Sequence, residues 1–321
     1  MTPRQLRRLL FVELLIYAVL GSMLASRAGW TPLQATGLAL ASFFGLRLFV
    51  VALTFSIMLT ASGTVPDELR IGHARALRMV LEEYAGLVLL FSVIQPFEGF
   101  WLGPDRLSKP LGGRLPLLLI HGYQCNRGFW FWLRPKLEAA GWTVATHNMG
   151  PVWADIDHYA EGIARRIDQV LAATGAPQVI LVAHSMGGLA CRAYLRRYGK
   201  AKVARLITLG SLHQGTRLAR LGLGHNARQM NIGNPWLIAL GERDAVPLPP
   251  GSVSIYSRHD NYVFPHETSS RLEGATNIAI GGVSHIGMAF SPVVLAKLLE
   301  VLESPGGATP VPANPRSESR A

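Results

Sequence analysis

The chain has 321 residues, of which 49% are hydrophobic and only 16% are charged, which excludes an intrinsically disordered protein. Lysine and arginine outnumber aspartate and glutamate by 31 to 20, a formal charge of +11. The excess arginines are scattered along the chain, so the charge does not indicate a nucleic-acid partner, whereas a membrane surface with anionic lipids would attract it. The length predicts one catalytic-size domain with an appended segment, because single cores usually stop growing near about 250–300 residues.

Two long apolar runs lie near the N-terminus, behind a cluster of three arginines. Residues 9–24 contain a single charge, Glu13, and residues 33–59 contain a single charge, Arg47. At 1.5 Å per residue the second run is long enough to cross a hydrocarbon core of about 30 Å. Two such runs in tandem predict transmembrane helices and a membrane-anchor region over residues 1–103.

The number of spans and their orientation stay open at this point. A third apolar run, residues 87–102, is short and interrupted by Glu98. Arginines flank the first two runs on their outer sides and only Arg27 lies between them, so the positive-inside rule predicts a hairpin with both ends in the cytoplasm. A third span would move the rest of the chain to the other side. The alternative to an anchor is a presequence cleaved near Ala25, followed by a buried amphipathic helix.

Beyond residue 103 the long apolar runs give way to short ones separated by turn residues, which predicts a domain over residues 104–303. Short apolar strands alternate there with amphipathic helices, such as residues 159–173 and 188–198, and a closing helix covers 292–302. This alternation predicts an α/β fold, with a mostly parallel sheet and helices on both faces. The tail, residues 304–321, is rich in Pro, Gly and Ser and is predicted to be disordered. The predicted strands are residues 116–120, 142–147, 179–183, 203–209, 253–256 and 277–280.

The most informative segment is VILVAHSMGG at residues 179–188, an apolar strand that ends in a serine and runs directly into a helix. Small residues two positions before and after Ser185, namely Ala183 and Gly187, are typical of the sharp turn called a nucleophile elbow. Ala183 stands where Gly is more usual, a difference of one methyl group. The N-terminus of the following helix offers backbone N–H groups to a developing negative charge. Ser185 is therefore the predicted nucleophile.

A serine hydroxyl needs a histidine to accept its proton and a carboxylate to orient that histidine. Asp260 follows the fifth predicted strand and His285 follows the sixth, so the chain order is Ser, Asp, His, as in the α/β-hydrolase fold. Both residues lie beyond the carboxyl ends of their strands, where the loops of a parallel sheet converge on a site. Asp244 is an alternative acid, although no predicted strand delivers it to that edge.

The oxyanion of an acyl-transfer reaction must be held by preorganised backbone N–H groups. Met186, directly after the predicted nucleophile, supplies the first of them. Tyr123 is the predicted second donor, because Gly122 lets the backbone turn inward after the first strand. The sequence shows no metal-ligand pattern, its cysteines Cys125 and Cys191 are predicted to be free thiols, and this chemistry needs no metal and no cofactor.

The roles of three further features are less well defined by the sequence. The aromatic segment at residues 129–132 is either a wall for an apolar acyl chain or part of the core. His184 is expected to point away from the nucleophile, and His213 is expected to shape the wall of its pocket. A short lid is possible within residues 218–240.

Five segments together resemble bacterial triacylglycerol lipases and esterases of the α/β-hydrolase superfamily, and the resemblance runs from about residue 115 to 302. One departure is Leu212, where these lipases often carry Pro. The segments are LIHGY at 119–123, AHSMGG at 183–188, TLGSLHQGT at 208–216, SRHDN at 257–261 and VSHIG at 283–287.

The resemblance implies a serine hydrolase that cleaves carboxylic esters through an acyl-enzyme intermediate. It implies a triad of Ser185, Asp260 and His285, with Tyr123 and Met186 as oxyanion donors. Together with the anchor it predicts an apolar or lipid-like ester as substrate and the cytoplasmic side of a bacterial inner membrane as location. The open alternatives are an acyltransferase or thioesterase with the same triad, or a non-catalytic interaction module, and the oligomeric state is undetermined.

Overall fold

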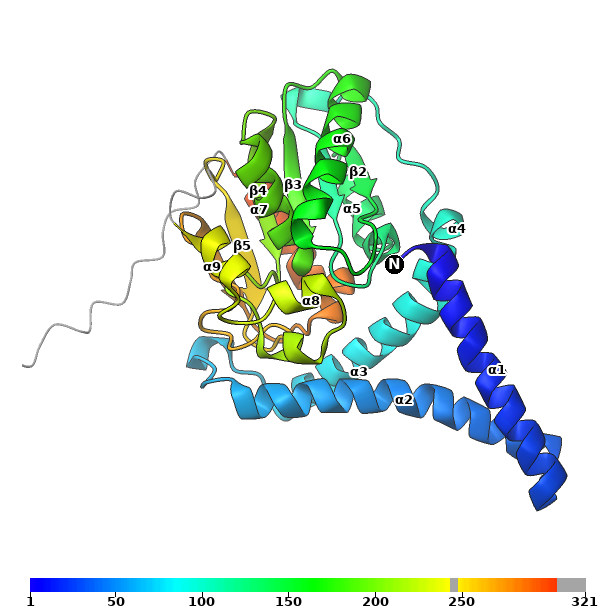
Figure 1. The fold of residues 1–321 in the computed structure, drawn as a ribbon. Helices are drawn as coiled ribbons and strands as arrows, with labels where there is room; N and C mark the ends of the chain where they lie inside the picture. Colours follow the sequence, from blue (N-terminus) through cyan, green and yellow to red (C-terminus); the bar gives the residue numbers. More distant parts are fainter. Residues whose placement is uncertain (243–247, 305–321) are drawn as a thin grey trace, which may run out of the picture.

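The computed structural model describes residues 1–242 and 248–304. Its α/β domain is built on a six-stranded, all-parallel sheet with the strand order β2-β1-β3-β4-β5-β6 (Figure 1). Each of the six predicted strands is present, with its ends shifted by no more than two residues. The strands are β1 (Leu117–Ile120), β2 (Val144–His147), β3 (Val179–His184), β4 (Val203–Leu209), β5 (Val253–Ser257) and β6 (Thr276–Ile280).

Helices cover both faces of the sheet, which confirms the predicted fold class. The three helices expected from the apolar periodicity correspond to α6, α7 and α10. Shorter helices and single turns follow the strand ends. The helical elements of the domain are η4 (Leu111–Gly113), η5 (Arg127–Trp130), α5 (Leu133–Ala139), α6 (Ile156–Thr174), α7 (Met186–Tyr198), η6 (Arg217–Leu221), α8 (His225–Gln229), α9 (Pro235–Gly241), η7 (Ile286–Phe290) and α10 (Pro292–Glu303).

The strands are apolar on both sides because each side is covered by a helical layer. In β1, Leu118 and Ile120 pack into a core with α6 and α7, whereas Leu117 and Leu119 pack into a second core with α5 and α10. All four side chains are fully buried. The central strands therefore form a rigid support whose carboxyl ends carry the loops of interest.

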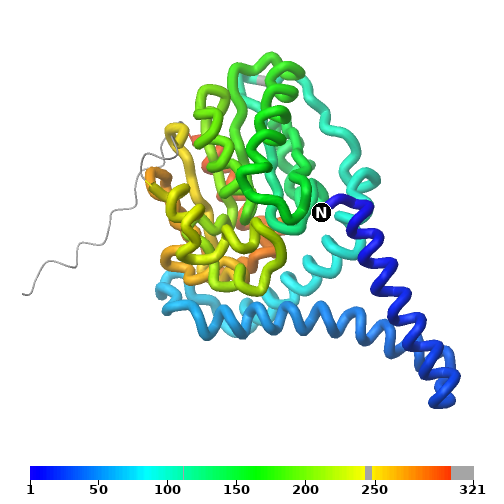
Figure 2. Tube along the Cα trace, in the orientation of Figure 1, coloured from blue at the N-terminus to red at the C-terminus, as the bar shows by residue number. Residues whose placement is uncertain are grey.

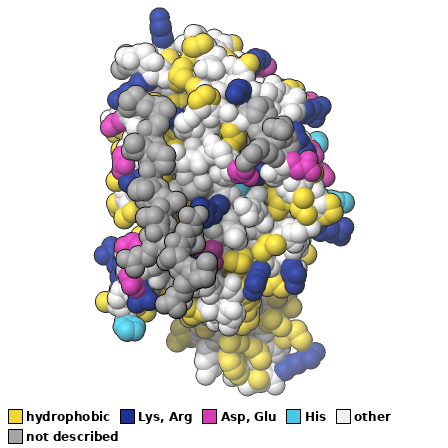
Figure 3. All heavy atoms as spheres, turned by 90° about the vertical axis from the view of Figure 1, so that its left-hand side faces the viewer, with side chains coloured by type: hydrophobic (Ala, Val, Ile, Leu, Met, Phe, Trp, Pro, Cys, Tyr) yellow, Lys and Arg dark blue, Asp and Glu magenta, His cyan; other side chains and the backbone are white. Residues whose placement is uncertain are grey.

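The two N-terminal apolar runs form long helices, α1 (Pro3–Ala28) and α2 (Pro32–Ala61), and both are long and apolar enough to cross a membrane. They meet at the turn between them and diverge toward the α/β domain (Figure 2). None of the most apolar 18-residue window of α1 is buried, and hydrophobic side chains gather below the domain at the lower end of the face in Figure 3. Among the described residues, no other helix has this length and hydropathy.

The single charges of the two apolar runs pair with each other. Arg47 donates two hydrogen bonds to the carboxylate of Glu13, each 2.8 Å long, and its guanidinium also lies over the ring of Phe43. The pairing links the two helices as an antiparallel hairpin.

The third apolar run does not form a helix of membrane-spanning length. It continues α3 and packs against the domain, where Leu90 and Ile94 are buried in the same core as Leu117 and Leu119. Residues before position 104 thus contribute to the core of the α/β domain. The predicted tail lies outside the described residues apart from Ser304. The elements between α2 and the domain are η1 (Asp67–Leu69), α3 (His73–Leu89), the π-helical turn η2 (Leu90–Ile94), η3 (Gln95–Phe97) and α4 (Glu98–Leu102).

Candidate active site

Ser185 lies at the turn between β3 and α7, close to the point where the strand order reverses between β1 and β3. Ligands of open α/β sheets bind at such reversals. The backbone of Ser185 has φ 55° and ψ −128°, a strained conformation that is uncommon for a residue other than glycine. Gly187 is needed here because a Cβ atom on it would lie 2.6 Å from the carbonyl oxygen of His121.

The loops after β5 and β6 bring Asp260 and His285 to this serine. His285 Nε2 lies 3.0 Å from Ser185 Oγ, and His285 Nδ1 lies 2.8 Å from Asp260 Oδ2. All three side chains are buried. The three groups are thus linked in the order hydroxyl, imidazole, carboxylate by two hydrogen bonds of ordinary length.

The carboxylate of Asp260 is held by its own loop. Its Oδ1 accepts hydrogen bonds from the N–H groups of Tyr262 and Val263, both 2.8 Å long, which leaves Oδ2 for His285. The alternative acid, Asp244, lies outside the described residues.

The imidazole of His285 is enclosed by two other rings. Tyr262 stacks on it with the ring centroids 5.0 Å apart, and His184 lies at 4.5 Å on a tilted plane. Burial alone would lower the pKa of His285, but the charge of Asp260, its hydrogen bond and the nearby carboxyl of Glu83 outweigh burial, so the pKa is raised above 6.5.

The expectation that His184 points away from the site was wrong. Its ring stacks on Phe129 with centroids 4.2 Å apart, and its Nε2 lies 3.3 Å from the carbonyl oxygen of His285. Sequence position alone could not show this, because His184 contacts residues 283–287, the loop of the predicted base His285 (the base loop), which lies about a hundred residues away in the chain.

The predicted oxyanion donors are Tyr123, in the loop after β1, and Met186, the residue after Ser185. Among the described residues, the backbone N–H groups of Tyr123 and Met186 donate no hydrogen bond to the protein, so both are free to bind a ligand atom. The loop of Tyr123 approaches closely, since a Cβ atom on Gly122 would lie 2.8 Å from Ser185 Cβ. The Tyr123 hydroxyl donates to the carbonyl oxygen of Leu223 at 2.6 Å and accepts from its N–H at 2.9 Å, which ties this loop to the segment after η6.

An apolar cavity of about 540 Å³ extends from Ser185 and His285. Its wall includes Phe129 of the aromatic segment, whereas the neighbouring Trp130 is fully buried in the core, so the segment serves both purposes that the sequence left open. Helices that precede the α/β domain supply one side of the cavity, and the η6–α8 segment supplies another. The apolar lining residues outside the sheet loops are Val50, Leu53, Leu87, Phe91, Leu218, Ala219, Leu221, Leu223, Ala227 and Met230.

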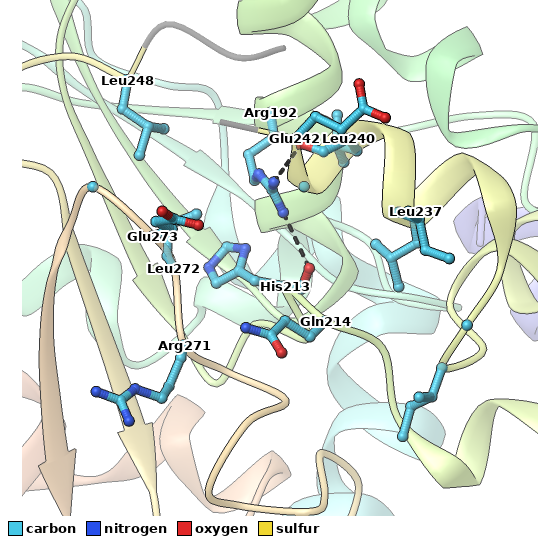
Figure 4. A pocket seen from close by; sticks show the side chains of 15 residues that line it. Arg192, His213, Gln214, Leu237, Leu240, Glu242, Leu248, Arg271, Leu272 and Glu273 are labelled. Atoms are coloured by element: carbon cyan, nitrogen blue, oxygen red, sulfur yellow. Dashed lines mark hydrogen bonds between the residues drawn. The ribbon is translucent and has the colours of Figure 1, made fainter. Parts of the chain in front are cut away.

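A second and larger cavity, of about 950 Å³, shares no described lining residue with the first (Figure 4). His213 lines this second cavity and not the cavity at Ser185, so its expected role there was wrong. Its Nε2 lies 3.0 Å from Thr208 Oγ1, and Arg192 donates to the carbonyl oxygens of His213 and Leu240. These contacts join α7 to the ends of β4 and α9.

Three polar residues near the base loop were not singled out in the sequence. Asn261 Oδ1 accepts a hydrogen bond from the N–H of His285 at 3.1 Å, and Asn261 Nδ2 donates to Thr54 Oγ1 at 2.8 Å. Glu83 Oε2 accepts from the N–H groups of the two residues after His285. One local feature of the sequence could have identified Glu83. It is a charged residue on the same face of α3 as the buried residues Met79 and Gly86.

Cys125 and Cys191 are buried free thiols. Burial raises the pKa of Cys125 to about 12, so this thiol, which borders the Ser185 cavity, is not ionised near neutral pH. Within the described part of the chain, no three His, Cys, Asp or Glu side chains gather in a way that could hold a metal ion.

Known proteins are similar to parts of this domain in sequence and to its fold in structure. Residues 116–238 match the family model of the alpha/beta hydrolase fold. Triacylglycerol lipases of Pseudarthrobacter phenanthrenivorans and Burkholderia plantarii are each 32% identical over 114 residues, which is 33% of this chain and 35% and 32% of theirs. The matched segment thus spans about a third of the length of these relatives.

Aspergillus fumigatus lipase B has a similar fold, with a TM-score of 0.55 and 21% identity, over 61% of this chain and 54% of that structure. The sheet order, the turn at Ser185 and the match over residues 116–238 agree with one another. The family match ends before Asp260 and His285, so the geometry around Ser185 is the separate evidence for these two residues. Residues 116–238 are therefore similar to the α/β-hydrolase fold family, and the domain has the fold seen in lipases.

Proposed function

We propose that this protein is a membrane-anchored serine hydrolase that cleaves carboxylic esters, with Ser185 as nucleophile, His285 as general base and Asp260 as the orienting acid. The observation that carries the proposal is the chain of two hydrogen bonds from Ser185 Oγ through His285 to Asp260, at one end of an apolar cavity. A structural role alone does not account for a strained, buried serine bonded to a histidine next to two unbonded N–H groups.

The reaction proceeds in two steps. Ser185 Oγ attacks the ester carbonyl carbon while its proton moves to His285 Nε2, and the oxyanion that forms accepts from the N–H groups of Tyr123 and Met186. The intermediate then collapses, and His285 passes the proton to the leaving alcohol. Water, deprotonated by the same histidine, attacks the acyl-enzyme and releases the acid. Asp260 keeps the hydrogen on Nδ1 during both steps and stabilises the imidazolium.

The experiment that tests this proposal is labelling of the full-length protein in detergent micelles by a fluorophosphonate probe, together with product analysis on ester and thioester substrates. We expect labelling at Ser185 and release of free acid from esters. Faster turnover of thioesters, or transfer of the acyl group to an acceptor other than water, would favour the alternative activities. Absence of both labelling and turnover would favour the non-catalytic module.

The substrate class is inferred from the cavity walls. Apolar side chains dominate the cavity beyond Ser185, and each buried methylene group of an acyl chain contributes about 0.8 kcal/mol of binding. The relatives that share sequence with this chain are named triacylglycerol lipases. An apolar ester, with its acyl chain in this cavity, is therefore the proposed substrate.

Replacing Leu53 of α2 by a polar residue tests whether the acyl chain binds in the cavity at Ser185. For Leu53→Gln we expect kcat/KM for a p-nitrophenyl octanoate to fall about 10-fold, while the value for the acetate changes little, because only the longer chain reaches this wall. The matched control is Leu59→Gln, on the same helix and absent from the cavity lining, where Leu59 is 75% exposed. Equal losses for octanoate and acetate would show that Leu53 does not contact the acyl chain.

Membrane anchoring is supported by α1 and α2. These helices leave an apolar surface uncovered that is unusual for a soluble protein, and their two internal charges neutralise each other through the Arg47–Glu13 pair. The arginine distribution supports a hairpin with both ends in the cytoplasm. Protease added to intact inner-membrane vesicles tests the side: cleavage of the domain only in inside-out vesicles is expected, and cleavage only in right-side-out vesicles would reverse the assignment.

The rise of activity on the acid side of the pH profile is expected to have its midpoint above pH 6.5. His285 must be uncharged to accept the serine proton, and its pKa is raised because the charge of Asp260 and its hydrogen bond outweigh burial. kcat/KM for a non-ionising ester should therefore rise with pH through a midpoint above 6.5. A midpoint below this value would show that burial dominates.

A further inference from the structure

The loop that carries His285 is held by side chains from outside it. Three consecutive N–H groups, those of His285, Ile286 and Gly287, are bonded by side-chain oxygens rather than by the main chain. Asn261 Oδ1 accepts the first at 3.1 Å, and Glu83 Oε2 accepts the second and third at 2.9 and 3.0 Å. These N–H groups open the short helix η7, and His285, its N-cap residue, makes no capping bond with its own side chain.

The first N–H groups of a helix have no partner within the helix and need an acceptor from elsewhere. An acidic side chain is favourable at this position because it also faces the positive end of the helix. In this protein the acceptor comes from α3, more than two hundred residues earlier in the chain. Glu83 thus caps η7 across the interface between the N-terminal segment and the domain.

The contact is close and buried. Glu83 is completely buried. One turn further along α3, a Cβ atom on Gly86 would lie 3.2 Å from Ile286 Cγ2, so the backbone of α3 packs directly against a side chain of η7. Burial raises the pKa of Glu83, against the opposing effects of the Ser284 hydroxyl, the Gly287 N–H and His285. A carboxyl group without hydrogen-bond partners would be costly at such a position.

Helix α2 reaches the same loop by a second route. Thr54 Oγ1 donates to the carbonyl oxygen of Val51 at 2.9 Å and accepts from Asn261 Nδ2 at 2.8 Å. This contact orients the amide of Asn261, whose oxygen then accepts from the N–H of His285. Helices α2 and α3 therefore both act on the backbone at and immediately after His285.

We propose that Glu83 is a positioning residue for the base His285, acting as a hydrogen-bond acceptor that fixes the start of η7. This inference rests on the proposed function. Glu83 contacts none of the reacting atoms; it holds the backbone from which the imidazole reaches Ser185 Oγ at 3.0 Å. Displacements of about 1 Å in such geometry can lower rates by about 10²-fold. The N-terminal segment is accordingly part of the active site as well as an anchor.

The test compares Glu83→Ala and Glu83→Gln in the full-length protein in detergent micelles, with Glu82→Gln as matched control. Glu82 is the preceding residue on α3 and pairs instead with Arg75 and Arg78. kcat and KM for a short-chain ester and the rate of fluorophosphonate labelling are measured for each. For Glu83→Ala we expect kcat and the labelling rate to fall about 10- to 100-fold with KM nearly unchanged.

Glu83→Gln should retain activity within about 3-fold, because the amide oxygen still accepts both N–H groups. Glu82→Gln should match the parent protein. Parent-level kcat in Glu83→Ala would overturn the proposal, and so would equal losses in Glu83→Gln and Glu83→Ala, since the lost acceptor would then not be the cause.

A second pair of variants covers the case in which Glu83→Ala does not fold. Thr54→Val removes the hydroxyl that orients Asn261 and is expected to lower kcat about 3- to 10-fold, and Thr54→Ser, which keeps the hydroxyl, should restore it. Unchanged kcat in Thr54→Val would count against anchoring of the base loop by these helices. If the parent protein neither labels nor hydrolyses esters, the proposed function fails; if it does both and the variants equal it, only the positioning role fails.

Discussion

Replacing Ser185 by alanine is expected to lower kcat for ester hydrolysis by about 10⁴-fold or more, because no other group can form the acyl-enzyme. The residual rate would come from the oxyanion donors and from substrate binding. The fold should persist, because the Ser185 hydroxyl bonds only to His285 among the described residues and alanine keeps the same Cβ atom at the strained turn. Single-turnover hydrolysis and fluorophosphonate labelling of the purified variant measure the effect.

Ser291→Ala is a suitable control for this variant. Ser291 caps α10 by accepting from the N–H of Val294 at 3.3 Å and takes no part in the site, so its loss should cost about 1 kcal/mol of stability and leave kcat unchanged. Ser185→Ala with parent-level turnover, or probe attached to another residue, would refute the assignment of the nucleophile.

Replacing Asp260 by asparagine is expected to lower kcat by about 10⁴-fold without unfolding the protein. Asp260 Oδ1 accepts from the N–H groups of Tyr262 and Val263, so an asparagine must keep its oxygen there and turn its NH₂ group toward His285 Nδ1. The histidine must then accept at Nδ1 and carry its hydrogen on Nε2. In that tautomer it cannot take the proton from Ser185.

The same variant changes the pH dependence in a defined direction. The charge of Asp260 and its hydrogen bond both raise the pKa of His285, so their loss should move the acid limb of the residual activity to lower pH. The control is Asp244→Asn, which should retain parent activity. Full activity of Asp260→Asn combined with loss in Asp244→Asn would transfer the acid role to Asp244.

The sequence predicted the partners of His285 but not the surroundings of two other histidines. Ser185, Asp260 and His285 were selected because their order along the chain is that of the α/β-hydrolase fold. In the structure, His285 lies within hydrogen-bonding distance of both Ser185 and Asp260. The surroundings of His184 and His213 were misjudged, because the neighbours of a ring after a strand depend on which distant loops fold over that strand. Of the two roles that the sequence left open for residues 129–132, a cavity wall and a place in the core, Phe129 has both and Trp130 only the second.

Local patterns were enough to identify the α/β class, all six strands and the elbow at Ser185. Buried parallel strands are short apolar runs, and the turn into α7 requires small residues at fixed positions, so both features can be read within a few residues. The roles of Glu83 and Thr54 required the folded molecule, since Glu83 meets Ile286 across 203 positions and Thr54 meets Asn261 across 207. Contacts of that range arise from the docking of α2 and α3 on the domain, which joins these N-terminal helices to the base loop and leaves no periodicity in the sequence.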